Sequence, residues 1–235
     1  DYYLVNGQKT FITNGFMCDM VIVAVKTNKN TENEDVSLLI MEVKSEGFAK
    51  GNPLKKIGMK SQDTAELFFD NVKVPKENLL GEEGKGFHIM MSELARERLT
   101  VAITAVATAQ GAIESTIEYT NERSAFGNSI ASFQNTQFKL VECATKLQLH
   151  QSFLDSCIEH LMHETLSAEI ASMIKFSATD ICGEVVDECL QLFGGYGYMW
   201  EYPISRMYVD NRVARIYAGT NEIMKVIVAR KLFRK

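Results

Sequence analysis

Hydrophobic residues follow one pattern in the first third of the chain and another in the rest. Up to about residue 81, short apolar runs rich in β-branched residues predict strands at residues 3–5, 9–13, 20–25, 36–43, 65–69 and 72–74. Asn6-Gly7, between the first two runs, predicts a hairpin turn because this dipeptide accepts positive φ angles. The run at 20–25 has no polar alternation, which predicts a strand buried on both faces. Residues 28–35 are polar and predict a loop.

From residue 82 onward the pattern becomes helical. It predicts helices at about residues 84–122, 131–160, 164–194 and 220–233, with a shorter helix near 203–213. Residues 102–112 are dense in alanine, threonine and glycine, which lets neighbouring helices approach closely, so we expect this helix to be central in a bundle. The sequence thus predicts an α+β protein. A partial β-barrel or sandwich domain at 1–81, incomplete at its N-terminus, would precede an up-down four-helix bundle at 82–235.

Composition changes this picture little but excludes some functions. The chain has 235 residues, of which 46% are hydrophobic and 23% charged, as in ordinary globular proteins. Its net charge of −5 argues against a nucleic-acid partner, because phosphate backbones are held by clustered lysine and arginine. The most apolar run, residues 99–113, is too short to cross a bilayer, so we expect no membrane span.

Cysteine and histidine positions argue against disulfides and metals. The five cysteines are an odd number without a C-x-x-C pair, which predicts buried thiols in a reducing compartment. His160 and His163 share a helix face, but no third ligand is placed beside them, so we expect no metal site. No signal peptide opens the chain, and it starts inside a predicted strand, so we expect it to be a fragment.

Two glycine-containing segments hold candidate chemistry, and each has two interpretations. Residues 191–198 end a predicted helix with three glycines, either as a helix C-cap or as bare backbone that a phosphate-bearing cofactor approaches. Their spacing matches neither a Rossmann nor a P-loop fingerprint. Residues 218–223 open the last helix, where Thr220 or Asn221 either simply caps it or helps to bind an anion at its N-terminus.

A carboxylate flanked by two cations is the third candidate. Glu97 lies between Arg96 and Arg98, just before the small-residue stretch of the central helix. On a solvated face this arrangement would be unremarkable. A glutamate that enters a packed bundle is costly to bury unless it has a partner or a role.

Taken in order, several segments resemble the acyl-CoA dehydrogenase family. The matching motifs are FITNG at 11–15, DTAELFF at 63–69 followed by Val74-Pro75, ERSAFG at 122–127, Gln134, QLFGG at 191–195, EYP at 201–203 and IYAGTNE at 216–222. Each motif is weak alone, but their order and separations across the whole chain make the resemblance specific. It implies an FAD-dependent oxidoreductase of fatty acid β-oxidation, which converts an acyl-CoA to its trans-2-enoyl-CoA.

One departure from the family pattern concerns the base. Many members carry the catalytic glutamate between the Tyr and Gly of the last motif, where this chain has Ala218. The long-chain and isovaleryl branches place it on an earlier helix before Arg-Leu, which implies Glu97 as the base for the α proton, with hydride passing to the flavin N5. A dry, apolar pocket would raise its pKa. Residues 198–204 and 219–225 resemble the long-chain branch more than the isovaleryl branch.

The resemblance also implies ligand contacts. The substrate positions are His88, Ala95, Arg96, Arg98, Ala218 and Gly219, and the N–H of Ala218 would polarise the thioester carbonyl. The cofactor positions are Phe11, Ile12, Thr13, Arg123, Gln134, Gln191, Leu192, Phe193, Gly194, Gly195, Thr220, Asn221 and Glu222. Arg123, Gln134 and residues 191–195 match positions that bind the ADP half across a subunit interface, which implies a homo-oligomer, commonly a dimer of dimers.

The implied setting is the mitochondrial matrix or the bacterial cytoplasm, with electron-transfer flavoprotein as the electron acceptor. The family's N-terminal helical domain and first β strands, which this sequence lacks, carry part of the site, and this puts the activity of the chain alone in doubt. Three alternatives stay open: an isovaleryl or other branched-chain dehydrogenase, an acyl-CoA oxidase, and a catalytically silent helical assembly module.

Overall fold

A computed structural model describes residues 1–27 and 36–233, so the loop expected at 28–35 lies outside the described residues. The chain divides into two compact units, Asp1–Glu93 and Leu94–Lys235. The domain boundary expected between residues 81 and 82 stays a prediction. In the part of the chain that the structure describes, no helix is both long and apolar enough to cross a membrane.

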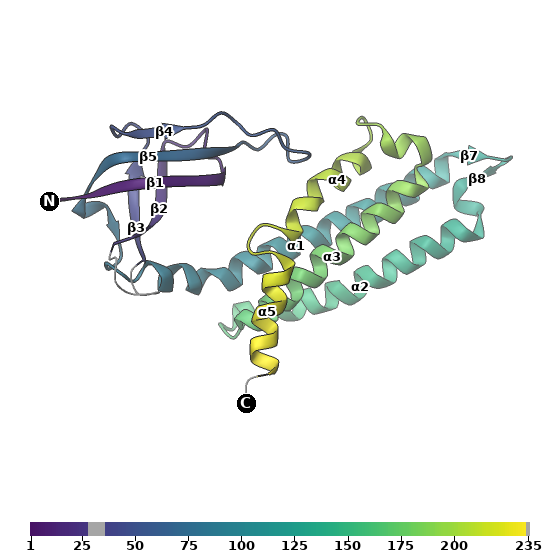
Figure 1. Ribbon diagram of the computed structural model, residues 1–235. Helices are drawn as coiled ribbons and strands as arrows, with labels where there is room; N and C mark the ends of the chain where they lie inside the picture. The colour runs from purple at the N-terminus through teal and green to yellow at the C-terminus, as the bar shows by residue number, and fades with distance from the viewer. Residues whose placement is uncertain (28–35, 234–235) are drawn as a thin grey trace. The chain divides into compact units, whose positions relative to one another are not determined.

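The first unit contains two small antiparallel sheets (Figure 1). One sheet has the strand order β1-β5-β4, with bounds Tyr2–Thr13, Thr64–Pro75 and Phe48–Lys50. The other has the order β2-β3-β6, with bounds Met20–Lys26, Val36–Glu42 and Leu79–Leu80, and a 3-10 turn at Lys76–Asn78 precedes β6. Apolar side chains from both sheets form one core, made by Val5, Val23, Leu39, Met41, Leu67, Phe69, Val72 and Val74. The described strands close no barrel.

The predicted hairpin at Asn6-Gly7 is wrong, because β1 is one continuous strand. Its pairing with β5 shifts register between Val5 and Gly7, so the dipeptide forms a β-bulge. Gly7 has φ of 142°, and the Asn6 side chain accepts a hydrogen bond from the backbone N–H of Asn71 at 2.8 Å. The positive φ angle is therefore used inside a strand rather than in a turn. Residues 65–69 and 72–74 likewise belong to one strand, β5.

The prediction that residues 20–25 are buried on both faces is also wrong. Met20 and Ile22 are 57% and 54% exposed, whereas Val23 is buried. Val21, Val23 and Val25 pack in the core and alternate with the exposed Met20 and Ile22, so the core covers only one face of β2. The apolar run therefore contributes alternate residues to the core and leaves the others on the surface.

Helices dominate the second unit (Figure 1). Their bounds are Gly86–Glu122 for α1, which begins in the first unit, Gln134–Met162 for α2, Ala168–Leu192 for α3, Pro203–Asn211 for α4 and Asn221–Leu232 for α5. A short hairpin, β7 at Ser124–Ala125 with β8 at Asn128–Ser129, and a 3-10 turn at Ile130–Ser132 connect α1 to α2. The five predicted helices are confirmed within a few residues, and so is the α+β class.

Small residues bury one face of α1 in the bundle. Ala102, Ala105, Ala109 and Ala112 recur every three or four positions and are at most 2% exposed. They pack into one apolar cluster with α2 and α3, in which α3 residues such as Ile174 take part. Alanine leaves room for neighbouring helices on this face. The central helix of the described bundle is α3, however, because it contacts α2, α4 and α5, so the expectation that α1 is central is wrong. Four free cysteines are buried in the same unit, at positions 143, 157, 182 and 189.

Candidate cofactor and substrate site

The glycine-rich segment ends α3 and shapes a turn. α3 stops at Leu192, and a 3-10 helix follows at Gly194–Tyr198. Gly194 has φ of 58°, a left-handed conformation that glycine adopts without strain. A Cβ atom on Gly197 would lie 2.4 Å from the carbonyl oxygen of Leu190. By contrast, a Cβ atom on Gly195 would meet nothing within 4 Å, so the helix end does not require glycine there.

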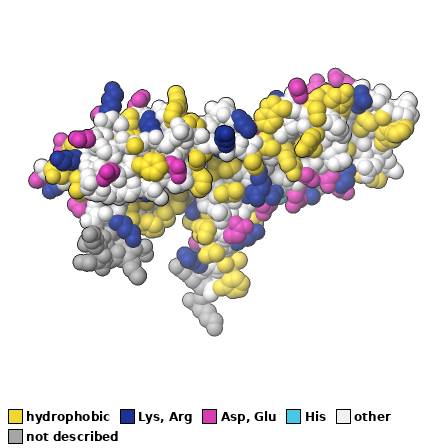
Figure 2. Space-filling model, turned by 45° about the horizontal axis from the view of Figure 1, so that its top comes forward, with side chains coloured by type: hydrophobic (Ala, Val, Ile, Leu, Met, Phe, Trp, Pro, Cys, Tyr) yellow, Lys and Arg dark blue, Asp and Glu magenta, His cyan; other side chains and the backbone are white. Residues whose placement is uncertain are grey.

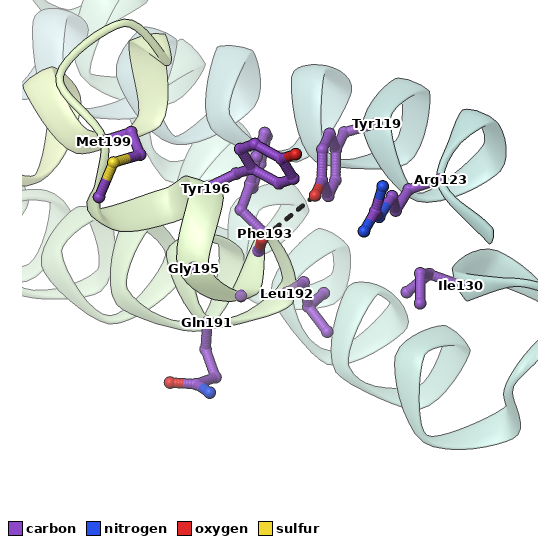
Figure 3. Close-up of a pocket in the computed structure, with 10 residues that line it drawn as sticks. Tyr119, Arg123, Ile130, Gln191, Leu192, Phe193, Gly195, Tyr196 and Met199 are labelled. Atoms are coloured by element: carbon purple, nitrogen blue, oxygen red, sulfur yellow. Dashed lines mark hydrogen bonds between the residues drawn. The ribbon is translucent and has the colours of Figure 1, made fainter. Parts of the chain in front are cut away.

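This turn borders a hollow of about 580 Å³ (Figure 3). The hollow is lined by Tyr119, Arg123, Ile130, Gln191, Leu192, Phe193, Gly194, Gly195, Tyr196 and Met199. The ring of Tyr119 stacks on Phe193 with centroids 4.2 Å apart, and its hydroxyl donates to the Phe193 carbonyl at 3.2 Å. The Arg123 guanidinium lies 5.4 Å from the centre of the Tyr196 ring.

The chemistry of this hollow suits a nucleotide. Among the described residues, no carboxylate forms a salt bridge with Arg123, so its charge is available to an anion. Aromatic rings and bare glycine backbone lie beside this cation, and together they can hold a flat ring and a phosphate. In Figure 3 the Gln191 side chain extends away from Arg123. Gln134, at the start of α2, is exposed and does not line the hollow.

A second hollow, also of about 580 Å³, lies at the end of β1. Its lining includes Ile12, Thr13, Asn14, Gly15, Met17, Cys18, Met20, Val21 and Ile22. Phe11 does not line it and is 76% exposed. The register of β1 against β5 shifts between Lys9 and Ile12, and Phe11 has φ of 60°, which is rare for an aromatic residue. An exposed, strained aromatic residue next to a hollow suits contact with a flat ligand.

The α1 segment that contains Glu97 differs from the sequence interpretation. Glu97 is exposed, and Arg98 is the charged residue that enters the bundle, with 6% exposure. Arg98 follows the helical period of Leu99 and Ala102, which are buried on the same side. Its Nη1 donates to the Ser172 hydroxyl at 3.4 Å, and burial lowers its pKa while Glu97 raises it.

The remaining substrate positions on α1 are mostly at the surface. His88 and Arg96 are exposed, and Ala95 is half-buried. His88 belongs to the part of α1 in the first unit, whereas the other two belong to the second. These substrate positions and the proposed base, Ala95, Arg96, Glu97 and Arg98, are consecutive on α1. Only the side chain of Arg98 is buried in the helical bundle.

The turn before α5 has left-handed backbone at two successive residues. Ala218 has φ of 52° and Gly219 has φ of 88°. Thr220 is the N-cap of α5, and its hydroxyl accepts from the Ile223 N–H at 3.4 Å. Glu222 bonds its own backbone N–H and the Thr220 hydroxyl, and both contacts lower its pKa.

Asn221 does not share the exposure of its neighbours. It is 3% exposed, and its amide donates to Thr179 at 2.9 Å and to Asp180 at 3.0 Å, both on α3. Its side chain therefore faces the bundle, and a cofactor contact through that side chain is not supported by this placement. No sequence motif marked the α3 residues below this turn. Their only signal is a polar residue at positions 172, 175 and 179 of a largely apolar helix.

Comparison with known proteins identifies the relatives of this chain. Residues 84–233 match the acyl-CoA dehydrogenase C-terminal domain, and residues 1–72 match the acyl-CoA dehydrogenase middle domain. The chain belongs to the acyl-CoA dehydrogenase family. The resemblance seen in the sequence motifs is thereby confirmed.

Individual members of the family match over nearly all of the chain. Long-chain specific acyl-CoA dehydrogenase of Sus scrofa mitochondria is 47% identical over 98% of this chain and 54% of its own length. The CarC subunit of the caffeyl-CoA reductase-Etf complex of Acetobacterium woodii is 39% identical over 100% of this chain and 62% of its own. An acyl-CoA dehydrogenase structure from Geobacillus kaustophilus superposes with a TM-score of 0.97 at 48% identity, covering all of this chain and 62% of that one. The chain thus spans about half to three fifths of the length of these acyl-CoA dehydrogenase relatives.

Members of the acyl-CoA dehydrogenase family depend on FAD, and the residues present here fit that cofactor. The hollow at the end of α3 offers a cation without a salt-bridge partner among the described residues, aromatic rings and glycine backbone. These are groups that bind a dinucleotide's phosphates and ring. The hollow at the end of β1 has an apolar and hydroxyl lining and an exposed aromatic residue beside it, which suits a flavin ring.

Proposed function

We propose that this chain carries the base and much of the cofactor site of an FAD-dependent enzyme that converts a long-chain acyl-CoA to its trans-2-enoyl-CoA. The observation that carries this proposal is the combination of Ala218 in the left-handed turn with Glu97 on α1. The turn has no carboxylate where many members have one, and Glu97 occupies the alternative position. The 47% identity to mitochondrial long-chain acyl-CoA dehydrogenases supports the choice of acyl chain.

Glu97 would remove the α proton of the thioester. Its carboxylate is exposed on α1, so a bound ligand can reach it. An apolar acyl chain that covers this carboxylate would exclude water and disfavour its charged form, which raises the pKa toward the range useful for a base. Its neighbour Arg98 is fixed inside the bundle and holds this turn of α1 in place.

The turn before α5 would stabilise the charge that develops on the thioester oxygen. A backbone N–H that donates a hydrogen bond to that oxygen binds it more strongly as negative charge develops there. This stabilises the transition state and lowers the barrier to removal of the α proton. We assign this role to the N–H of Ala218, and it needs no side chain at that position. FAD, when bound, supplies the hydride acceptor.

Each unit carries residues to which we assign a contact with FAD. In the first unit, Phe11, Ile12 and Thr13 would contact a flavin. In the second unit, we assign a flavin contact to Thr220, the Asn221 backbone and Glu222 at the start of α5. The ADP half would lie against Arg123, Gln134 and residues 191–195, and His88, Ala95, Arg96 and Gly219 would line the acyl-CoA path.

Exposed apolar side chains on the helices support a homo-oligomer. On α2, Phe138, Val141 and Leu149 lie along one face and are 55%, 63% and 67% exposed. Ile223 and Val226 of α5 are also exposed. Figure 2 shows hydrophobic side chains at the surface between charged ones of both signs. Burial of such residues between copies is favourable, and we propose a dimer of dimers in which the ADP site is completed by a neighbouring subunit.

Electron-transfer flavoprotein is the proposed electron acceptor. One relative is named as a subunit of a complex with Etf, and one structural neighbour is described as an electron-transferring flavoprotein. The mammalian relatives are named as mitochondrial, whereas others come from bacteria, so we propose the mitochondrial matrix or the bacterial cytoplasm.

Anaerobic bleaching of the flavin tests this function. The flavin-loaded holoenzyme is mixed with palmitoyl-CoA or isovaleryl-CoA, and Glu97→Gln is compared with Glu118→Gln, an exposed glutamate on the same helix. We expect palmitoyl-CoA to bleach the flavin quickly and Glu97→Gln alone to slow the reaction by about 100-fold or more. Preferential bleaching by isovaleryl-CoA would reassign the substrate. If neither thioester reacts, or if Glu97→Gln reacts like the wild type, the proposed mechanism is wrong.

A further inference from the structure

Below the turn that carries Ala218, α3 presents polar side chains to the interior of the bundle. Ser172, Lys175 and Thr179 are each 0% exposed. They lie three and four residues apart, which places them on one face of the helix. Polar groups at such positions are costly unless they are hydrogen-bonded, so their partners indicate what they do.

Lys175 is the central member of this face. Its ammonium donates to the carbonyl of Gly219 at 2.7 Å and to the side-chain oxygen of Asn221 at 3.0 Å. Within the described part of the chain, no carboxylate forms a salt bridge with it. A buried cation paired only with neutral acceptors is expensive, whereas an apolar side chain of the same length would fill the space at little cost. Packing alone therefore does not account for a lysine at this position.

One acceptor, Gly219, belongs to the turn, and the other, Asn221, begins α5 directly after the turn. Gly219 follows Ala218, and these two residues hold the left-handed conformations. A non-glycine residue with positive φ is strained and persists only where its surroundings hold it. Lys175 donates to the carbonyl of Gly219, directly after the strained Ala218, and it also binds Asn221, the first residue of α5. Thr179 adds a second contact to Asn221.

The other end of the same face reaches α1. The Ser172 hydroxyl accepts from Arg98, which adjoins Glu97 in the sequence. One face of α3 thus contacts both the α1 segment that carries the proposed base and the turn that carries the proposed N–H. All of these residues lie in the second unit.

We propose that Ser172, Lys175 and Thr179 form a positioning face, with Lys175 at its centre, that sets the Ala218 turn relative to Glu97. These residues do not touch the substrate and act through the turn and through Arg98. The inference rests on the function proposed above. Because reaction rates depend steeply on the placement of reacting groups, a loosened turn lowers the rate of the chemical step more than it lowers substrate affinity.

The test uses Lys175→Met in the flavin-loaded holoenzyme, with Lys139→Met as the matched control. Lys139 lies on α2 and pairs with Glu188 of α3 at 2.8 Å, at the surface of the same bundle. We expect Lys175→Met to keep FAD, to bind palmitoyl-CoA within about threefold of the wild type, and to bleach about 10- to 100-fold more slowly at saturating thioester. Lys139→Met is expected to match the wild type in FAD content, in palmitoyl-CoA affinity and in bleaching rate.

Hydrogen exchange supplies a readout that does not depend on activity. In Lys175→Met, the amides of residues 216–224 are expected to exchange faster than in the wild type, whereas Lys139→Met leaves them unchanged. If Lys175→Met keeps the wild-type bleaching rate and the wild-type exchange of this segment, the lysine is only a packing residue and the proposal is overturned.

Two milder substitutions decide the matter if Lys175→Met does not fold. Ser172→Ala and Thr179→Val each remove one hydroxyl of the positioning face and leave the lysine in place. We expect each to slow bleaching by about three- to tenfold with little change in thioester affinity. Wild-type rates in both would overturn the proposal. Failure of the proposed function gives a different result, because the wild type would then not bleach, or Glu97→Gln would react normally.

Discussion

The hydroxyl of Tyr119 donates to the carbonyl of Phe193 at 3.2 Å, and the two rings stack with their planes 17° apart. This pair joins α1 to the first residue after α3, where the glycine-rich turn begins. Burial raises the pKa of Tyr119, so the hydroxyl remains a donor throughout the neutral range. The turn beside the aromatic hollow at the end of α3 is thus held by a side chain of α1 that also lines this hollow.

Removing this hydroxyl tests how strongly the pair supports the hollow. Tyr119→Phe keeps the ring stack and loses one hydrogen bond, which we expect to cost about 1 kcal/mol of unfolding free energy. FAD affinity, measured by reconstitution of the apoprotein, should fall by about three- to tenfold. Tyr208→Phe, at an exposed position on α4, is the control and should change neither quantity. Unchanged FAD affinity in Tyr119→Phe would show that the pair does not shape the cofactor site.

Two glycines of the same turn separate its capping role from a phosphate-binding role. Gly197→Ala forces a Cβ atom to 2.4 Å from the Leu190 carbonyl, and overpacking of this kind costs about 1–3 kcal/mol of stability. Gly195→Ala meets no atom within 4 Å, so its stability should stay within about 0.5 kcal/mol of the wild type. If a phosphate approaches this backbone, Gly195→Ala loses about tenfold in FAD affinity while it melts normally. Retention of full FAD affinity would favour a simple helix cap.

Arg123 supplies a planar cation above the Tyr196 ring. Lysine keeps the charge but loses the planar, multiply donating geometry that binds phosphate and stacks on aromatic rings. Arg123→Lys is therefore expected to lower FAD affinity by about tenfold, with the melting temperature unchanged. Arg212→Lys, an exposed arginine of the same unit, serves as the control. Equal FAD affinities in both variants would exclude Arg123 from the cofactor site.

The buried ammonium of Lys175 makes stability depend on pH. Burial lowers its pKa from 10.5 to about 8; the charge of Arg98 also lowers it, whereas Asp180 and Glu222 oppose the change. Between pH 8 and 10.5 the unfolded chain binds this proton and the folded chain does not, so stability should rise with pH across that window. The full gain corresponds to roughly 3 kcal/mol.

Urea unfolding of the wild type and of Lys175→Met measures this contribution. Other titrating groups cancel when the unfolding free energy of the variant is subtracted from that of the wild type at each pH. From pH 7.5 to 9.5 we expect this difference to shift by about 2 kcal/mol in favour of the wild type. A difference that does not vary with pH would mean that Lys175 keeps its ordinary pKa in the folded protein.

Local sequence patterns predicted the positions of the helices and strands well, but they were wrong about one turn and about the burial of one strand. Helical spacing located all five helices, and the longer ones, such as α3, bury an extended apolar face. Asn6-Gly7 carried the positive φ angle of a turn, yet long-range pairing with β5 turned it into a bulge. The apolar run that contains Ile22 suggested burial on both faces, but whether a second layer covers the outer face depends on how the whole unit packs, which no single run encodes.

The site was predictable only where motifs mark it. The glycine-rich turn and the segment at 216–222 were found from their residues, because glycine positions and helix starts leave local signals. Glu97 was interpreted as the charge that enters the bundle, whereas helical phase gives that place to Arg98. Lys175 left no signal beyond a polar residue in an apolar helix. Its role depends on a turn 44 residues away in the sequence, a contact that only the fold creates.

The buried cysteines give the helical unit a built-in chemical reporter. Burial raises the pKa of Cys157 to about 11 and of Cys182 to about 12, so neither thiol reacts while the bundle is closed. Cys18, half-buried, lies in the other unit. The rate at which a thiol reagent labels Cys157 and Cys182 therefore times the opening of the helical unit, and the half-buried Cys18 is a reference thiol whose labelling needs no such opening.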